Sequence, residues 1–190
     1  MDRPVTEIAA RPRRSAFTLV ELMIVVATLG VLASMAIPVF VKYFRRSKTV
    51  EALMNLRKLY DSSTAYFVSG CDERNPTRDG VLATRQFPAT QERTPADRDF
   101  CAVPGNKFDP RDSDWRTPTW QALNFALSDP HYFKYSYESA GLERESRFTA
   151  RANGDLDCNK VESTFERVGS ADGDLNVRGG EGVFIRNEIE

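Results

Sequence analysis

The sequence predicts an α+β protein, in which one long N-terminal helix packs on a C-terminal antiparallel sheet of three or four strands. Two periodicities support this fold class. A helical pattern follows an uncharged apolar run and extends to about residue 68, and from His131 onward apolar and polar residues alternate. The stretch between them, residues 71–130, is rich in proline and is expected to be irregular.

The overall composition is that of a soluble globular chain. It has 190 residues, of which 41% are hydrophobic, and a formal net charge of −1. These values exclude a polytopic membrane protein and a disordered chain, and the near-neutral charge argues against a nucleic-acid partner. The average hides an uneven distribution, because the apolar residues gather near the N-terminus.

The apolar run near the N-terminus is long enough to cross a membrane. Residues 22–41 carry no charge, and a helix over residues 17–37 would measure about 32 Å, against about 30 Å for the core of a bilayer. No small-residue cleavage pattern follows the run, so it differs from an ordinary secretory signal. A buried core helix is the alternative interpretation.

Three residues interrupt this apolar run. Glu21 is an acid, and an unpaired carboxylate inside a membrane costs about 2.5 kcal/mol or more, so we expect it to find a partner or to lie near the headgroups. Gly30 and Pro38 both weaken a helix, the proline by removing one backbone hydrogen bond. The segment between them is therefore expected to bend or melt.

The residues around Glu21 carry a family resemblance. The segment reads Ser-Ala-Phe-Thr-Leu-Val-Glu-Leu-Met-Ile-Val-Val over residues 15–26 and continues to Gly30, Ala36, Ile37, Pro38 and Phe40. It resembles the N-terminal signature of type IV pilins and related pilin-like proteins. The resemblance implies that a prepilin peptidase removes the basic leader, residues 1–16, between Ala16 and Phe17 and then methylates the Phe17 amine. Ala16 stands where the family usually has glycine.

The resemblance also implies a function and a set of partners. The chain would be a structural subunit, a major or minor pilin, of a type IV pilus-like filament, and not an enzyme. Residues 17–41 would form the transmembrane and assembly half of the helix, with Glu21 pairing to the Phe17 amine of a neighbouring subunit. The partners would be other pilin subunits, the prepilin peptidase and the pilus assembly machinery of the inner membrane. The alternatives are a pseudopilin of a type II secretion system and a membrane-anchored ligand-binding domain.

The charges that flank the apolar run do not decide its orientation. The flanking basic residues are Arg11, Arg13 and Arg14 before it and Lys42, Arg45, Arg46 and Lys48 after it. They are nearly balanced under the positive-inside rule. The resemblance implies a cytoplasmic N-terminus and an exported pilin-like domain, residues 42–190. The protein would then span the inner membrane once before assembly and afterwards lie in a filament in the periplasm or at the cell surface.

Residues 42–68 are expected to continue the helix with an amphipathic pattern, and Gly70 is a stop signal. The apolar side is expected to hold Phe44, Ala52, Leu53, Leu56, Leu59, Tyr60 and Phe67. The spacing of the apolar residues within 120–127 predicts one short helical turn. Within residues 131–190, alternating segments around Tyr135, Ala150 and Ser163 predict three strands, and residues 183–185 a short fourth.

The three cysteines, Cys71, Cys101 and Cys158, predict one disulfide and one remaining thiol in an exported domain. The sequence leaves open whether Cys101 pairs with Cys71 or with Cys158. A zinc site is disfavoured, because there is no C-x-x-C pair and His131 is the single histidine. We expect His131 at the surface or at a strand edge, and no catalytic motif is present.

No cofactor is expected, and calcium is the one metal that the sequence keeps open. Asp155, Asp157 and Asn159 offer oxygen ligands at alternate positions, and Glu166 occupies the twelfth position of an EF-hand-like count. Lys160 stands where that motif requires glycine. Because Asp and Asn are also common turn residues, solvated turns are the favoured interpretation.

Overall fold

The computed structural model describes residues 17–69, 84–180 and 182–189. The chain divides into two compact units, residues 1–41 and residues 42–190, and a single helix, α1 (Leu19–Ser69), contributes to both. The sequence predicted this helix over residues 17–68, so the prediction of one long N-terminal helix is confirmed. Gly70 and Cys71 lie outside the described residues.

The first unit consists of the apolar half of α1. Its described side chains, from residue 17 to residue 41, are all exposed. Pro38 lies inside the helix without ending it. The hydroxyls of Thr28 and Ser34 donate to the carbonyls of Val25 and Val31, at 2.9 and 2.7 Å, so both polar side chains are satisfied within the helix.

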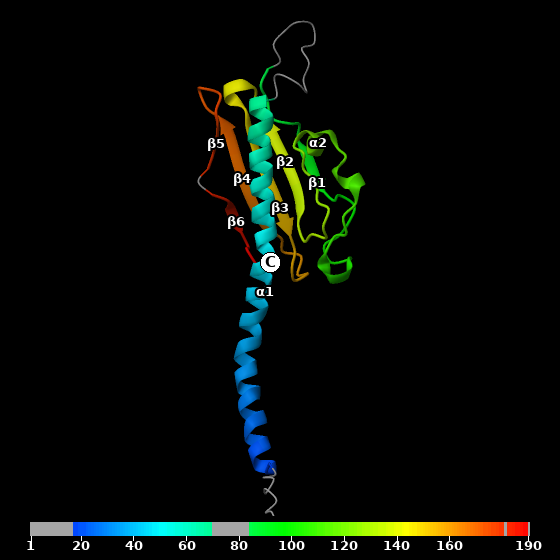
Figure 1. Cartoon of the computed structure of the whole chain (residues 1–190), viewed down its shortest axis with the longest axis vertical. Coiled ribbons are helices and arrows are strands. Elements are labelled where there is room, and N and C mark those ends of the chain that lie inside the picture. The colour runs from blue at the N-terminus through cyan, green and yellow to red at the C-terminus, as the bar shows by residue number, and fades with distance from the viewer. Residues whose placement is uncertain (1–16, 70–83, 181, 190) are drawn as a thin grey trace, which may run out of the picture. The chain divides into compact units, whose positions relative to one another are not determined.

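In the second unit, the amphipathic half of α1 lies across one face of the sheet (Figure 1). The residues that α1 buries there are Thr49, Ala52, Leu56, Leu59, Ser63 and Phe67. They follow the 3.6-residue period that the sequence indicated. Phe44 is the exception, since it is exposed and precedes the first buried residue, Thr49. Its place in the predicted apolar face was therefore wrong.

The sheet has six antiparallel strands rather than the three or four predicted. The strands are β1 (Gln91–Thr94), β2 (Lys134–Ala140), β3 (Arg147–Gly154), β4 (Ser163–Ala171), β5 (Val177–Gly179) and β6 (Phe184–Arg186). Their order is β1-β2-β3-β4-β5, and β6 also pairs with β4. The expected strands around residues 135, 150, 163 and 184 correspond to β2, β3, β4 and β6. The fold is therefore α+β, as predicted.

The two further strands are short and lack an alternating apolar pattern. β1 has the sequence Gln-Glu-Arg-Thr and lies within the stretch that was expected to be irregular, and β5 has three residues. The same stretch contains a short helix, α2 (Pro118–Ala122), close to the helical turn predicted at residues 120–127. The pairing of β1 with β2 places this stretch at the edge of the sheet opposite β5 and β6 (Figure 1).

The core of the second unit lies between α1 and the sheet and extends into the stretch before β2. Its largest fully buried side chains are Phe67, Phe108, Trp115, Trp120, Phe125, Phe133, Tyr135, Tyr137, Phe148 and Phe165. His131 belongs to this core, being 2% exposed, so of its two expected positions the surface was wrong, whereas its bridge to Phe108 just before β2 agrees with the strand edge. Its backbone pairs with that of Phe108, and its ring lies 5.8 Å from the Trp115 ring. Aromatic packing therefore buries it.

Candidate functional site

The start of α1 is closed by a reciprocal pair of hydrogen bonds between Thr18 and Glu21. The Thr18 backbone N–H and hydroxyl donate to Oε2 of Glu21, at 2.8 and 2.7 Å, and the Glu21 backbone N–H donates to the Thr18 hydroxyl, at 3.2 Å. This is a capping box, which satisfies two backbone N–H groups at a helix N-terminus. Sequence reasoning had identified Glu21 and not its partner. The T-x-x-E spacing before an apolar run was the signal that identifies Thr18.

Phe17 immediately precedes this cap and is 78% exposed, whereas Ala16 lies outside the described residues. A carboxylate near the first turn of a helix interacts favourably with the positive end of the helix dipole. Glu21 therefore has a local role in the isolated chain, in addition to any partner that it finds elsewhere. Its pairing with an amine remains a prediction.

The apolar side chains on the first half of α1 are exposed in the isolated chain. Among the described residues, α1 is the one helix long and apolar enough to cross a membrane. Gly30 lies on this exposed surface, where a Cβ built on it would meet nothing within 4 Å. A contiguous exposed apolar surface of this kind is covered in solution by lipid or by another protein. Gly30 and Pro38 both lie in this part, and the expected bending between them remains a prediction.

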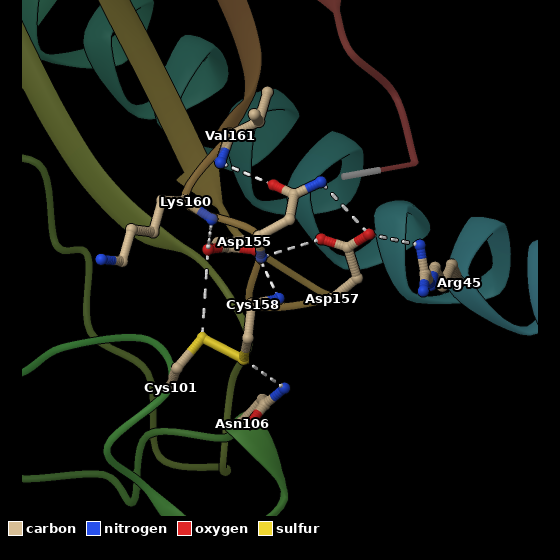
Figure 2. Close-up of polar contacts among 9 residues, drawn as sticks. Arg45, Cys101, Asn106, Asp155, Asp157, Cys158, Lys160 and Val161 are labelled. Atoms are coloured by element: carbon tan, nitrogen blue, oxygen red, sulfur yellow. Dashed lines mark hydrogen bonds and ion pairs between the residues drawn. A yellow bond between two sulfur atoms is a disulfide. The ribbon is translucent and has the colours of Figure 1, made fainter.

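A disulfide joins Cys101 to Cys158, which decides between the two pairings that the sequence left open. It links the stretch before β2 to the turn between β3 and β4, over a sequence separation of 57 residues (Figure 2). The side-chain amide of Asn106 lies 3.2 Å from the Cys158 sulfur. The stretch that carries α2 is thereby fixed to the sheet.

The candidate calcium ligands Asp155, Asp157 and Asn159 lie in the turn between β3 and β4, where Figure 2 labels Asp155 and Asp157. The carboxylate of Asp155, which is buried, accepts hydrogen bonds from the backbone N–H groups of Cys158 and Lys160, at 2.7 and 3.0 Å. Asp157 accepts from Arg45 at 2.9 Å, and Asn159 accepts from the backbone of Val161 at 2.6 Å. These groups thus organise the turn itself.

The twelfth position of the calcium pattern is not brought to this turn. Glu166 lies on β4 and pairs with Arg151 on β3. Within residues 17–69, 84–180 and 182–189, no group of three or more His, Cys, Asp or Glu side chains is arranged to hold a metal. Calcium binding remains a prediction that the arrangement of these side chains does not favour.

Comparison with known proteins gives one match to a family profile and several to curated proteins. The profile described as the prokaryotic N-terminal methylation motif matches residues 11–37. The type IV major pilin protein PilA of Myxococcus xanthus (strain DK1622) is 54% identical over 56 residues, which are 30% of this chain and 26% of the relative.

Two Neisseria proteins are also similar. The type IV major pilin protein PilE1 of Neisseria gonorrhoeae is 37% identical over 68 residues, 35% of this chain and 41% of the relative. A fimbrial protein of Neisseria meningitidis serogroup B is 36% identical over 72 residues, 37% of this chain and 42% of the relative. The chain thus spans between about a quarter and two fifths of the length of these relatives. No solved structure matches it significantly.

Proposed function

We propose that this chain is a structural subunit of a type IV pilus-like filament, made as a prepilin and assembled through the apolar half of α1. The observation that carries the proposal is the match of residues 11–37 to the prokaryotic N-terminal methylation motif, at the start of a long helix whose apolar part is exposed. The relatives named above are major pilins and a fimbrial protein, which favours a pilus subunit over a secretion pseudopilin. The α+β architecture of the second unit agrees with this role.

Processing would prepare the N-terminus for assembly. A cut between Ala16 and Phe17 removes a leader that contains four arginines and creates a new amine one residue before the Thr18 cap. Methylation of this amine by the prepilin peptidase keeps its positive charge. The mature chain would have 174 residues and a formal net charge of −3.

In the filament, Glu21 would pair with the Phe17 amine of a neighbouring subunit. The Glu21 carboxylate and the amine would each be costly to bury alone among apolar helices, whereas a close pair with further hydrogen bonds is tolerated. The Thr18 hydroxyl, which already donates to Glu21, would supply one of these hydrogen bonds. The requirement to bring the two charges together would fix the axial position of one subunit on the next.

The segment between Gly30 and Pro38 would adapt the helix to its two environments. Glycine lowers helix propensity and proline lacks one backbone hydrogen bond, so this segment is the least stable part of the apolar half of α1. Local bending or melting there would let the helices of neighbouring subunits pack after they leave the bilayer. Before assembly, the chain would span the inner membrane once with its N-terminus in the cytoplasm.

Residues 42–190 would form the exported domain, which would lie in the periplasm or at the cell surface. The Cys101–Cys158 disulfide is consistent with an oxidising compartment. The assembly machinery of the inner membrane would then move the subunit from the bilayer into the filament.

The experiment that tests this function compares cells that produce the wild-type chain with cells that lack it. Mass spectrometry of the mature protein is expected to find a chain that starts at Phe17 and is one methyl group heavier than the unmodified sequence. The sheared filament fraction is expected to contain this chain. A different N-terminus contradicts the processing step, and correct processing without any chain in the filaments contradicts the structural role.

A further inference from the structure

A group of cations lies at the start of the second unit, directly after the apolar run ends at Val41. We call it the basic cluster, and it consists of Lys42, Arg45, Arg46, Lys48 and Lys107. The sequence places the first four within seven residues. The fold adds Lys107, since the Nζ atoms of Lys48 and Lys107 lie 4.4 and 4.8 Å from the centroid of the same Tyr132 ring.

Three members of the basic cluster, all of them lysines, have no ion pair with a carboxylate among the residues that the structure describes. Arg45 pairs with Asp157 at 2.9 Å and Arg46 with Glu188 at 3.2 Å. Among the residues that the structure describes, neither Lys48 nor Lys107 lies within ion-pair distance of an acid. The contact with the Tyr132 ring compensates part of their charge.

The acid that interacts with Lys107, Glu51, is engaged elsewhere. Its carboxylate accepts from the backbone N–H of Tyr132, at 3.0 and 3.2 Å, and from the hydroxyl of Tyr135, at 3.4 Å. Burial, followed by the neighbouring charges of Lys107 and Arg45, lowers the pKa of Lys48. The two lysines therefore share an excess of positive charge that a bound anion would relieve.

If residues 17–41 span the bilayer as proposed above, the first residues of the basic cluster follow the span directly in the sequence and would lie near the lipid headgroups. At a rise of about 1.5 Å per residue, Lys48 lies about 10 Å beyond Val41 along α1. The headgroup region extends roughly 5–8 Å beyond each side of the hydrocarbon core, and a lysine side chain reaches several ångströms back toward it. Tyr43, which is 73% exposed, is a residue of the type enriched at this boundary.

We propose that the basic cluster binds the headgroup phosphate of an anionic phospholipid while the subunit resides in the membrane, with Lys48 and Lys107 as the two principal ligands. Both ammonium groups lie over the ring of Tyr132. A net negative headgroup is preferred to a zwitterionic one, because the latter brings its own cation to a site that already has an excess of positive charge. The inference rests on the membrane-spanning role proposed above for residues 17–41, and not on filament formation.

The test uses the full chain reconstituted in phosphatidylcholine bilayers and measures its association with spin-labelled phosphatidylglycerol relative to spin-labelled phosphatidylcholine. The wild-type chain is expected to prefer phosphatidylglycerol. Lys48→Gln and Lys107→Gln are each expected to lower this preference by up to about fivefold, the effect of one basic residue at an anionic surface. Replacement of both lysines by arginine retains the charge and is expected to retain the preference.

The matched control is Lys58→Gln, on the same helix. Lys58 also lies over an aromatic ring, that of Phe125 at 5.4 Å, but it follows Lys48 by ten residues. This variant is expected to bind lipid as the wild type does. Circular dichroism and the presence of the Cys101–Cys158 disulfide establish that each variant is folded.

Three results overturn the inference. If the wild type and both glutamine variants show the same lipid preference, the two lysines do not bind the headgroup. Binding of inorganic phosphate that depends on the two lysines, in a wild-type chain that shows no preference for phosphatidylglycerol, assigns the site to a free anion. Weaker self-association of the glutamine variants in pure phosphatidylcholine, without a change in lipid preference, assigns it to a second copy of the chain. A chain that does not float with the vesicles contradicts the spanning role as well, whereas an inserted chain without preference contradicts the lipid site alone.

Discussion

Nη1 of Arg45, near the start of the amphipathic half of α1, lies 2.9 Å from Oδ2 of Asp157, in the turn between β3 and β4. The two residues are 112 positions apart in the sequence. Both side chains are mostly buried, at 29% and 17% exposure. The Arg93–Glu162 pair has the same separation of 2.9 Å but is more exposed, at 49% and 33%. Because the distance is the same in both pairs, a comparison of their contributions to the free energy of unfolding measures the effect of burial.

Loss of the buried partner is expected to cost more than loss of the exposed one. Asp157→Ala leaves the Arg45 guanidinium partly buried without its acid, and we expect the free energy of unfolding to fall by about 1–2 kcal/mol. Glu162→Ala is expected to change it by less than about 0.5 kcal/mol. Urea unfolding of the full chain in detergent, followed by near-ultraviolet circular dichroism, measures both. Equal effects of the two substitutions would contradict this ranking.

The two roles of Glu21 are separable by substitution. Glu21→Gln retains the acceptor oxygen of the capping box and removes the charge. We expect slow amide exchange in the first turn of α1 to be kept and filament formation to be lost. Unchanged filament yield with this variant counts against the pairing with the Phe17 amine.

Thr18→Ala is the complementary change. It removes the hydroxyl that donates to Glu21 and accepts from the Glu21 N–H, while the carboxylate remains. We expect the first turn of α1 to lose about 1 kcal/mol of stability, detected as faster amide exchange at Glu21 and its neighbours. Protection that equals that of the wild type would show that the cap contributes nothing.

Gly169 is expected to tolerate no side chain. A Cβ at this position of β4 would clash with Cε1 of Phe148, whose ring is buried and stacked on Tyr137. Gly169→Ala is therefore expected to destabilise the second unit by about 1–3 kcal/mol through overpacking. Gly173→Ala is the control, because its Cβ meets nothing within 4 Å. The midpoints of urea unfolding of the two variants give the comparison, and a shift of equal size in both would exclude overpacking as the cause.

The stability of the second unit is expected to decrease as the pH falls below about 6.5, through His131. Burial, followed by the nearby charge of Arg98, lowers the pKa of this histidine, although the Asp129 carbonyl and Asp114 act in the other direction. The unfolded chain therefore binds a proton at a higher pH than the folded chain does. The stability is fully present above the unfolded pKa and is lost as the pH falls toward the folded one, by at most about 1.4 kcal/mol per pH unit.

The measurement is the free energy of unfolding between pH 8 and pH 5 for the wild type and for His131→Phe. His131 is the single histidine, so the difference between the two curves isolates it. Burial raises the pKa of the Glu51 carboxyl, which gives a slope of the opposite sign at lower pH, but this slope is common to both proteins. Parallel curves would exclude His131 as the source of the pH dependence.

The elements whose apolar pattern repeats over many residues were predictable from the sequence, because one side of each is buried along its length. The helix predicted at residues 17–68 is Leu19–Ser69, and the alternating residues of β2 and β3, such as Tyr135 and Ala150, are indeed buried. β1 was not predictable, since its four polar residues lie at the edge of the sheet and carry no pattern. The burial of His131 was not predicted, because the aromatic groups that cover it are distant in the sequence.

The features of the candidate site also fall into two groups, those visible in the sequence and those that depend on the fold. The acid at position 21 and the apolar run are local features and were visible in the sequence. The choice of Cys158 as the partner of Cys101 and the position of Lys107 beside Lys48 depend on how the stretch before β2 returns to the sheet. Such contacts join residues more than 50 positions apart, and no spacing rule in the sequence specifies them.

The C-terminal part of the chain protects the sheet against unwanted strand pairing. β4 would otherwise present a nine-residue edge, but β6 pairs with it at residues 164–166 and β5 at residues 169–171. Each of these two outer strands has three residues, and the opposite edge, β1, has four and is followed by Pro95. Short, interrupted edges are poor templates for intermolecular β-sheet growth. In the filament proposed above, subunits crowded side by side would thus associate through their helices without their sheets fusing into aggregates.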